Sequence, residues 1–210
     1  MEVSIIIPAF NEGMNISQVL DIVHTLRDDY EVLVVNDGSE DNTSDIVRSY
    51  DIRVLDMPEN KGKSYAMWAG VQDTKGRVIL FLDADLIGLR AEHIHEMTLP
   101  ITGDIADMTV GIFSSGRGFT DLAQKLTPFL SGQRGIRREI LNKLDEKEWV
   151  SGYGIEISLT RCAKERQLRI MEIPLAHVTQ AIKEEKLGLA KGVKARLKMY
   201  WEIAKEINRV

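Results

Sequence analysis

Short apolar runs alternate with amphipathic stretches along the first half of the chain. Four runs rich in Val, Ile and Leu have the length of buried strands, and they cover residues 3–7, 31–35, 53–56 and 78–82. Between them, apolar residues recur with the period of a helix around residues 16–26, 41–50 and 64–73. Strands and helices that alternate at this spacing predict an α/β fold, with a doubly wound, mainly parallel sheet that has helices on both faces.

The second half of the chain is less regular. Its pattern predicts strands at residues 108–113 and 169–173, and helices at about 91–99, 119–129 and 155–165. From Ala181 to Asn208, one apolar stripe in a basic segment predicts an amphipathic helix. Such a helix packs on its own domain or on a second copy, or lies on a membrane surface. We therefore divide the chain into a domain of residues 1–180 and a helical extension of residues 181–210.

The buried run Val78–Leu82 ends in two carboxylates, Asp83 and Asp85. Ligands of parallel α/β folds bind at the carboxyl ends of the strands. Two residues of strand span roughly 6–7 Å, so the two side chains are able to share one hydrated cation. Mg²⁺ and Mn²⁺ favour oxygen ligands and usually keep substrate phosphates as co-ligands. The alternative is an ordinary acidic turn, but Glu12 and Asp37 also follow predicted strands, and this repetition favours a metal–diphosphate site.

A second cluster of charged residues lies in Ser131–Arg138, where eight residues include three arginines and two glycines. Arginine forks match phosphates and carboxylates, so this segment is a candidate anion contact. The alternative is the start of a helix with solvated arginines. Glu156 is in the first turn of the predicted helix 155–165, where a carboxylate also stabilises the helix dipole.

Composition narrows the class of protein. The 210 residues are 44% hydrophobic and 28% charged, as in ordinary globular proteins. A net charge of −5 argues against a dedicated nucleic-acid binder. The single cysteine, Cys162, excludes an intrachain disulfide. We see neither a signal peptide nor an apolar run of 18 residues, and so expect a cytoplasmic protein.

Four motifs along the first half occur in an order that indicates a family. They are SIIIPAFNE at 4–12, VVNDGSEDNT at 34–43, NKGK at 60–63 and FLDAD at 81–85. Together they resemble family 2 glycosyltransferases of the GT-A fold. In the second half, SGQR at 131–134 and GYGIE at 152–156 are similar to segments of glucosyl-3-phosphoglycerate synthases and related small bacterial transferases.

The resemblance implies that residues 1–90 bind a nucleotide-diphosphate sugar, with UDP-glucose as the first expectation, together with Mg²⁺ or Mn²⁺. Asp37 is expected to accept a hydrogen bond from uracil N3–H, and Glu12 to reach the ribose hydroxyls. Lys63 is expected beside the diphosphate, and Asp85 with Asp83 is expected to hold the metal. Further donor contacts are expected at Pro8, Ala9, Phe10, Gly62 and Ala84.

Residues 91–180 are then expected to bind the acceptor, a small phosphorylated compound or a polyprenyl phosphate, to which glucose or mannose is transferred. The expected acceptor contacts are Gly132, Gln133, Arg134 and Tyr153, and the expected catalytic residues are Asp85, Arg134 and Glu156. Glu156 is either a general base or part of a retaining site that needs no base.

Relatives often supply a histidine to the metal. In this chain His177 is the candidate third ligand, or else a plain loop histidine, and Gln180 is the other residue that could fall on that position.

Two other functions fit the same residues. One is a nucleotide-sugar-binding protein without turnover. The other is a sugar nucleotidyltransferase, which would usually carry a Gly-rich loop after the first strand that Pro8–Gly13 lacks. A Rossmann oxidoreductase is disfavoured because no G-x-G-x-x-G follows that strand. We expect a homodimer formed through the C-terminal helices, or peripheral contact of those helices with the inner face of a membrane.

Overall fold

The computed structural model describes residues 1–113, 131–145, 149 and 155–181. The chain divides into two compact units, Met1–Thr179 and Gln180–Val210. All but the first two residues of the second unit lie outside the described part. The predicted helices at 119–129 and 181–208 therefore remain predictions. Among the described helices, none is long and apolar enough to cross a bilayer.

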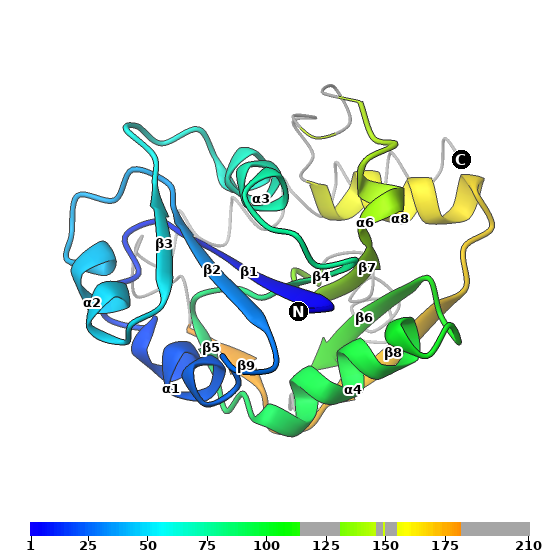
Figure 1. Ribbon diagram of the computed structural model, residues 1–210, viewed down its shortest axis with the longest axis horizontal. Coiled ribbons are helices and arrows are strands. Elements are labelled where there is room, and N and C mark those ends of the chain that lie inside the picture. The colour runs from blue at the N-terminus through cyan, green and yellow to red at the C-terminus, as the bar shows by residue number, and fades with distance from the viewer. Residues whose placement is uncertain (114–130, 146–148, 150–154, 182–210) are drawn as a thin grey trace, which may run out of the picture. The chain divides into compact units, whose positions relative to one another are not determined.

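A seven-stranded sheet forms the centre of the first unit (Figure 1). Its strands, in spatial order, are β3 (Arg53–Asp56), β2 (Glu31–Asn36), β1 (Val3–Ala9), β4 (Val78–Phe81), β7 (Arg134–Arg137), β6 (Met108–Phe113) and β8 (Ile170–Leu175). All neighbouring pairs are parallel except those that β7 makes with β4 and β6. Two short strands, β5 (Leu86–Ile87) and β9 (Thr179–Gln180), form a separate pair.

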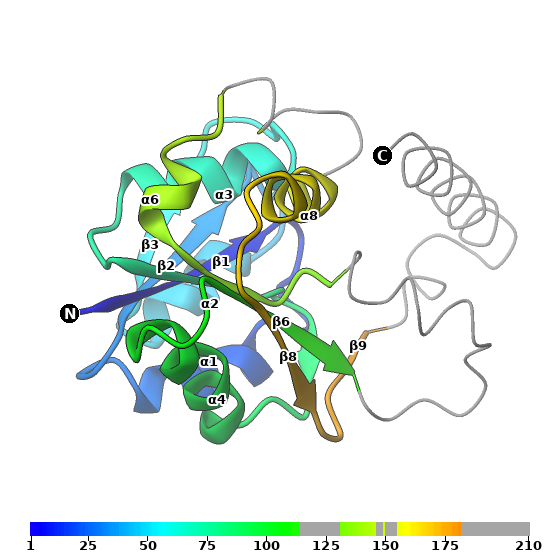
Figure 2. The ribbon, with the colours of Figure 1, turned by 90° about the vertical axis from the view of Figure 1, so that its right-hand side faces the viewer.

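Helices cover both faces of the sheet, as Figures 1 and 2 show. One apolar layer includes side chains of α1 (Ser17–Thr25), α2 (Thr43–Ser49) and α4 (Ala91–Thr102). The other includes side chains of α3 (Lys63–Gln72), α6 (Arg138–Leu141) and α8 (Ile155–Glu165). Successive strand residues alternate between the layers, with Ile5 and Ile7 in the first and Ile6 in the second. This double burial explains why the strands read as continuous apolar runs.

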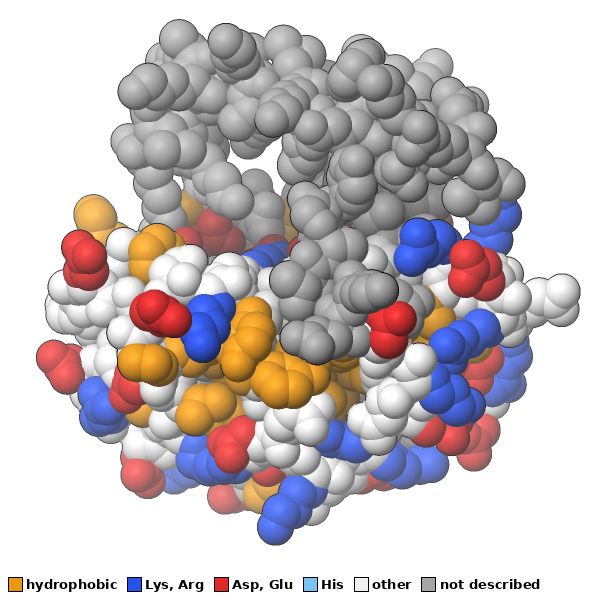
Figure 3. Space-filling model, turned by 90° about the horizontal axis from the view of Figure 1, so that it is seen from above, with side chains coloured by type: hydrophobic (Ala, Val, Ile, Leu, Met, Phe, Trp, Pro, Cys, Tyr) orange, Lys and Arg blue, Asp and Glu red, His pale blue; other side chains and the backbone are white. Residues whose placement is uncertain are grey.

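The outer side of the second layer carries both hydrophobic and charged side chains. Figure 3 shows hydrophobic side chains gathered among Lys, Arg, Asp and Glu on this face. Tyr65 and Trp68 of α3 are only partly buried there, and their ring centroids lie 5.2 Å apart.

The predicted fold class is confirmed, and the differences are local. The alternative of a helix start with solvated arginines at Ser131–Arg138 is wrong for its centre, because residues 134–137 form the buried strand β7, which the sequence pattern did not predict. The first strand was predicted at residues 3–7, where Pro8 follows the apolar run, but β1 continues through Pro8 to Ala9. β4 pairs with β1 only as far as Ile6, so the missing N–H of Pro8 breaks no bond to that neighbour.

Candidate functional site

The loops that follow β1 and β2 meet at one edge of the sheet because these strands are parallel neighbours. The backbone N–H of Asp37 donates to Ala9 O at 2.8 Å. The N–H of Asn11 donates to Ser39 Oγ, and that of Glu12 donates to Thr43 Oγ1, both at 2.9 Å. The two loops therefore form one connected surface at the carboxyl end of the sheet.

The Asp37 side chain is buried and holds a third loop. Its Oδ1 accepts from the N–H of Lys61 at 2.8 Å, and its Oδ2 accepts from the N–H of Gly62 at 2.9 Å. Gly62 is the residue that precedes α3 and has a φ of 91°, a conformation that glycine adopts without strain. Asp37 therefore lies between the end of β2 and the start of α3.

Lys63, the first residue of α3, joins two carboxylates from distant parts of the chain. Its Nζ lies 2.7 Å from Asp83 Oδ1, after β4, and 2.8 Å from Glu156 Oε1, in the first turn of α8. Burial alone would lower the pKa of Lys63, but the charges of Asp83 and Glu156 outweigh it and raise that pKa above its ordinary value. The Lys63 side chain is 41% exposed, so the ion pairs are screened and stabilise the fold by only about 1 kcal/mol. Their main effect is to fix where the cation lies.

The turn before β7 closes over Asp83. Gln133 Nε2 donates to Asp83 Oδ2 at 2.7 Å. A Cβ on Gly132 would lie 2.6 Å from Asp83 Oδ2 and 2.8 Å from Lys63 Nζ, closer than side chains tolerate. The absence of a side chain at 132 therefore lets the turn lie directly on this ion pair.

Arg134 lies in β7 and is 1% exposed, so it is not one of the solvated arginines of a helix start. Its Nε donates to Ser131 O at 2.9 Å. Burial lowers the pKa of Arg134 to about 10, while the charge of Glu156 acts in the opposite direction. The guanidinium is therefore a buried cation at neutral pH, and it interacts with the same Glu156 that contacts Lys63.

The carboxylates Asp83 and Asp85 have different surroundings. Asp83 accepts from both Lys63 and Gln133, whereas Asp85 is 6% exposed and directly precedes β5. Their hard oxygen atoms suit Mg²⁺ or Mn²⁺, which need only one or two carboxylates when waters and phosphates complete the shell. The donor set therefore fits such an ion, and the two carboxylates together would hold it.

His177 is not brought into a group of three ligands with these aspartates. Among the described residues, no three His, Cys, Asp or Glu side chains are placed to hold a metal ion. His177 is exposed, has a φ of 62°, and its backbone lies against Gly88, where a Cβ would be 2.4 Å from His177 O. The β8–β9 turn fixes the backbone at this position and leaves the side chain at the surface.

The other predicted contacts are distributed around this edge. Ala9 and Ala84 are buried, Pro8 is partly buried in β1, and Phe10 is 44% exposed. The carboxylate of Glu12 accepts from Asn15 Nδ2 at 2.9 Å. Tyr153 lies outside the described residues.

Sequence reasoning did not single out Ser64. Its Oγ accepts from the N–H of Ile155 at 3.3 Å, which ties the start of α8 to α3 beside Glu156. No local signal in the sequence predicts a contact between residues so far apart.

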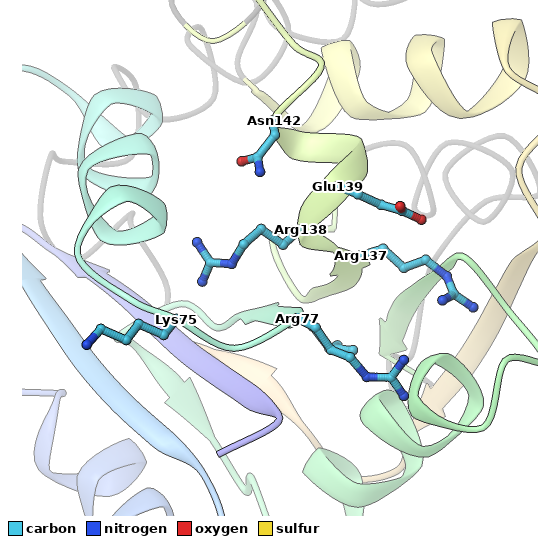
Figure 4. A pocket seen from close by; sticks show the side chains of 7 residues that line it. Lys75, Arg77, Arg137, Arg138, Glu139 and Asn142 are labelled. Atoms are coloured by element: carbon cyan, nitrogen blue, oxygen red, sulfur yellow. The ribbon is translucent and has the colours of Figure 1, made fainter.

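The described residues also enclose a pocket of about 390 Å³ away from this edge (Figure 4). Its basic lining residues are Lys75, Arg77, Arg137 and Arg138. The arginine heads are already engaged: Arg77 with Glu2, Arg137 with Asp104 and Asp107, and Arg138 with three acceptors around the end of α3. These side chains hold the structure together, so we do not assign the chemistry to this pocket.

The sequence model of the family "Glycosyl transferase family 2" matches residues 4–161 of this chain. A dolichyl-phosphate beta-glucosyltransferase of Trichomonas vaginalis is 28% identical, over 81% of this chain and 62% of that protein. A glucosyl-3-phosphoglycerate synthase of Mycobacterium tuberculosis is also 28% identical, over 75% of this chain and 59% of that protein. The chain thus spans about three-fifths of the length of these curated relatives.

Solved structures of the M. tuberculosis glucosyl-3-phosphoglycerate synthase have the same fold. The complex with Mn²⁺, UDP-glucose and phosphoglyceric acid has a TM-score of 0.73 and 25% identity, and covers 89% of this chain and 74% of that one. The complex with Mg²⁺ and UDP has a TM-score of 0.71 and 27% identity, with the same coverage.

Proposed function

This chain belongs to glycosyl transferase family 2, and on that premise we propose that it transfers a hexose from a UDP-sugar to a phosphorylated acceptor. The observation that carries the proposal is the cluster at the end of β4, where Lys63 contacts both Asp83 and Glu156 and Asp85 is two residues away. Carboxylates for a metal and a fixed cation for phosphate are what the departure of a nucleoside diphosphate requires.

The nucleoside end of the donor is assigned to the loops after β1 and β2. Asp37 is the proposed acceptor for uracil N3–H, and Glu12 the proposed contact to the ribose. Both oxygens of Asp37 already accept one backbone N–H each, but a carboxylate offers about four lone-pair sites in all. A further hydrogen bond from the base is therefore compatible with the contacts described.

Mg²⁺ or Mn²⁺ is the proposed cofactor, held by Asp85 with Asp83. Bound there, the ion would act as a Lewis acid that neutralises charge on the departing UDP. Lys63 adds a positive charge at the same edge of the sheet, and its two carboxylate partners orient it before substrate binds. We propose that Glu156 positions Lys63, because Glu156 Oε1 accepts a hydrogen bond directly from the Lys63 ammonium.

The acceptor is proposed to be anionic. One relative is named for dolichyl phosphate, and another is solved with phosphoglyceric acid. In this chain Gln133, which donates to Asp83, and the buried cation of Arg134 are the groups proposed to recognise the acceptor. Both a small phosphorylated compound and a polyprenyl phosphate fit this proposal, and UDP-glucose is the first donor to test.

Calorimetric titration tests the donor assignment. UDP, UDP-glucose and GDP-mannose would be titrated with and without Mn²⁺ into the wild type and Asp85→Ala. We expect UDP and UDP-glucose to bind with Mn²⁺ and to bind at least tenfold more weakly to Asp85→Ala, a loss of about 1.4 kcal/mol. Asp73→Asn, at the far end of α3, is the charge-matched control. Absence of nucleotide binding in every condition would refute the proposal, and binding without transfer to any phosphorylated acceptor would favour a binding protein without turnover.

A further inference from the structure

The loop between β3 and α3 contacts three successive residues at the end of β2, which are Asn36, Asp37 and Gly38. The N–H of Met57 donates to Asn36 O at 2.9 Å. Gly38, with a φ of 69°, lies so close to the loop backbone that a Cβ would be 2.5 Å from Glu59 C. Between them, Asp37 accepts from the N–H groups of Lys61 and Gly62.

The Asp37 contacts act on the start of α3. Gly62 directly precedes that helix and makes no side-chain cap of its own. The first N–H groups of a helix need partners from outside it, and the carboxylate of Asp37 supplies one for the residue that leads into the helix. Lys63 follows at once, so the position of Asp37 determines where the Lys63 backbone begins.

We propose that Asp37 is a positioning residue for Lys63, and so couples recognition of the base to the cation at the diphosphate. Asp37 is 2% exposed, and its two oxygens contact successive residues of the loop. The coupling runs through one carboxylate, two amides and the first residue of α3. This inference rests on the proposed function, because it concerns how that UDP site is organised.

A comparison of uridine with UDP separates this role from a simple base contact. Loss of a base contact weakens both ligands equally, whereas displacement of Lys63 weakens only the ligand that carries phosphates. In Asp37→Asn, one amide N–H would face the side-chain NH₂ in place of an acceptor. We expect the preference for UDP over uridine to fall by about tenfold, the size of one charge-assisted hydrogen bond.

A double-mutant cycle makes the test specific. In Lys63→Met the preference for UDP should already be reduced, and adding Asp37→Asn should reduce it no further. Asp73→Asn removes the same charge at the other end of α3, where the carboxylate pairs with Arg53, and should leave the preference unchanged. An unchanged preference in Asp37→Asn, or full additivity with Lys63→Met, would overturn the proposal.

A second measurement needs no ligand and decides even if the variant does not fold. Amide hydrogen exchange of Lys61 and Gly62 in the wild type should be slower than in a free peptide, because Asp37 accepts from both N–H groups. Exchange as fast as in a free peptide would contradict these contacts and overturn the proposal. Failure of the wild type to bind UDP would instead refute the proposed function, and the exchange result would stand or fall separately.

Discussion

At the scale of single residues, the site depends on a side chain that is absent. Gly132 lies where a Cβ would be 2.6 and 2.7 Å from the two oxygens of Asp83 and 2.8 Å from Lys63 Nζ. The turn that contains Gly132 also places Gln133 on Asp83. A methyl group at this position would push the turn away from the Asp83–Lys63 ion pair, or push Asp83 and Lys63 apart.

Gly132→Ala is therefore expected to weaken UDP binding in the presence of Mn²⁺ by about tenfold, with little change in the melting temperature. Calorimetry and thermal unfolding monitored by circular dichroism would measure the two effects. Gly103→Ala is the matched control, because Gly103 has a φ of −82° that alanine adopts and a Cβ there would meet Leu99 O at 3.1 Å, at the end of α4, which supplies none of the site residues. Equal UDP affinity in Gly132→Ala and wild type would show that the turn has room to move.

At the scale of elements, Asp107 joins three strands from the second half of the chain. It directly precedes β6, and its oxygens accept from Arg137 of β7 and from Arg169, which precedes β8. Hydrogen bonds from the Arg169 guanidinium, helped by the Arg169 backbone N–H and the charge of Arg137, outweigh burial and hold the pKa of Asp107 well below its usual range. The parallel pair β6–β8 and the antiparallel β7 are thus tied together at one end.

Asp107→Asn is expected to lower the free energy of unfolding at pH 7 by about 1 kcal/mol, since Arg169 is more than half exposed and the pair is screened. A depressed pKa stabilises the fold above the unfolded value of about 3.9, and this contribution is lost as pH falls through the lower folded value. The difference between variant and wild type in urea unfolding should therefore shrink below about pH 4. Asp28→Asn, an exposed carboxylate in the turn after α1, should show no difference at either pH.

At the scale of the whole molecule, the described residues of both apolar clusters lie within the unit Met1–Thr179. A chain that ends at residue 181 is expected to keep its secondary structure and to melt within about 5 °C of the full chain, a change of roughly 1 kcal/mol. Circular dichroism would measure this, and loss of the cooperative transition would show that residues 182–210 complete the core.

The same pair of chains tests the predicted role of the C-terminal segment. Light scattering should find a dimer for the full chain and a monomer for the shortened one, if the segment forms the dimer contact. Sedimentation with anionic vesicles, lost when Lys191, Lys194 and Lys198 are replaced by Glu, would support membrane contact in its place. A monomeric full chain would end the dimer prediction.

The sequence by itself determined the fold class and most of the elements. Buried parallel strands and amphipathic helices leave periodic patterns within a few residues, so β3 and β6 begin and end where the apolar pattern predicts. The acids at 83 and 85 could also be placed, because an apolar run locates the end of a strand. The four ordered motifs also indicated the family, because each motif is a short continuous segment that can be recognised without the fold.

Only the tertiary structure decided the partners. Lys63 and Glu156 lie 93 residues apart in sequence, and nothing in either segment indicates that they meet. β7 carries two arginines and a glycine in four residues, so its local pattern does not show that it lies between two buried strands. Contacts such as Asp37 with the Lys61 and Gly62 amides arise from the packing of loops against strand ends, which depends on the whole sheet rather than on any one segment.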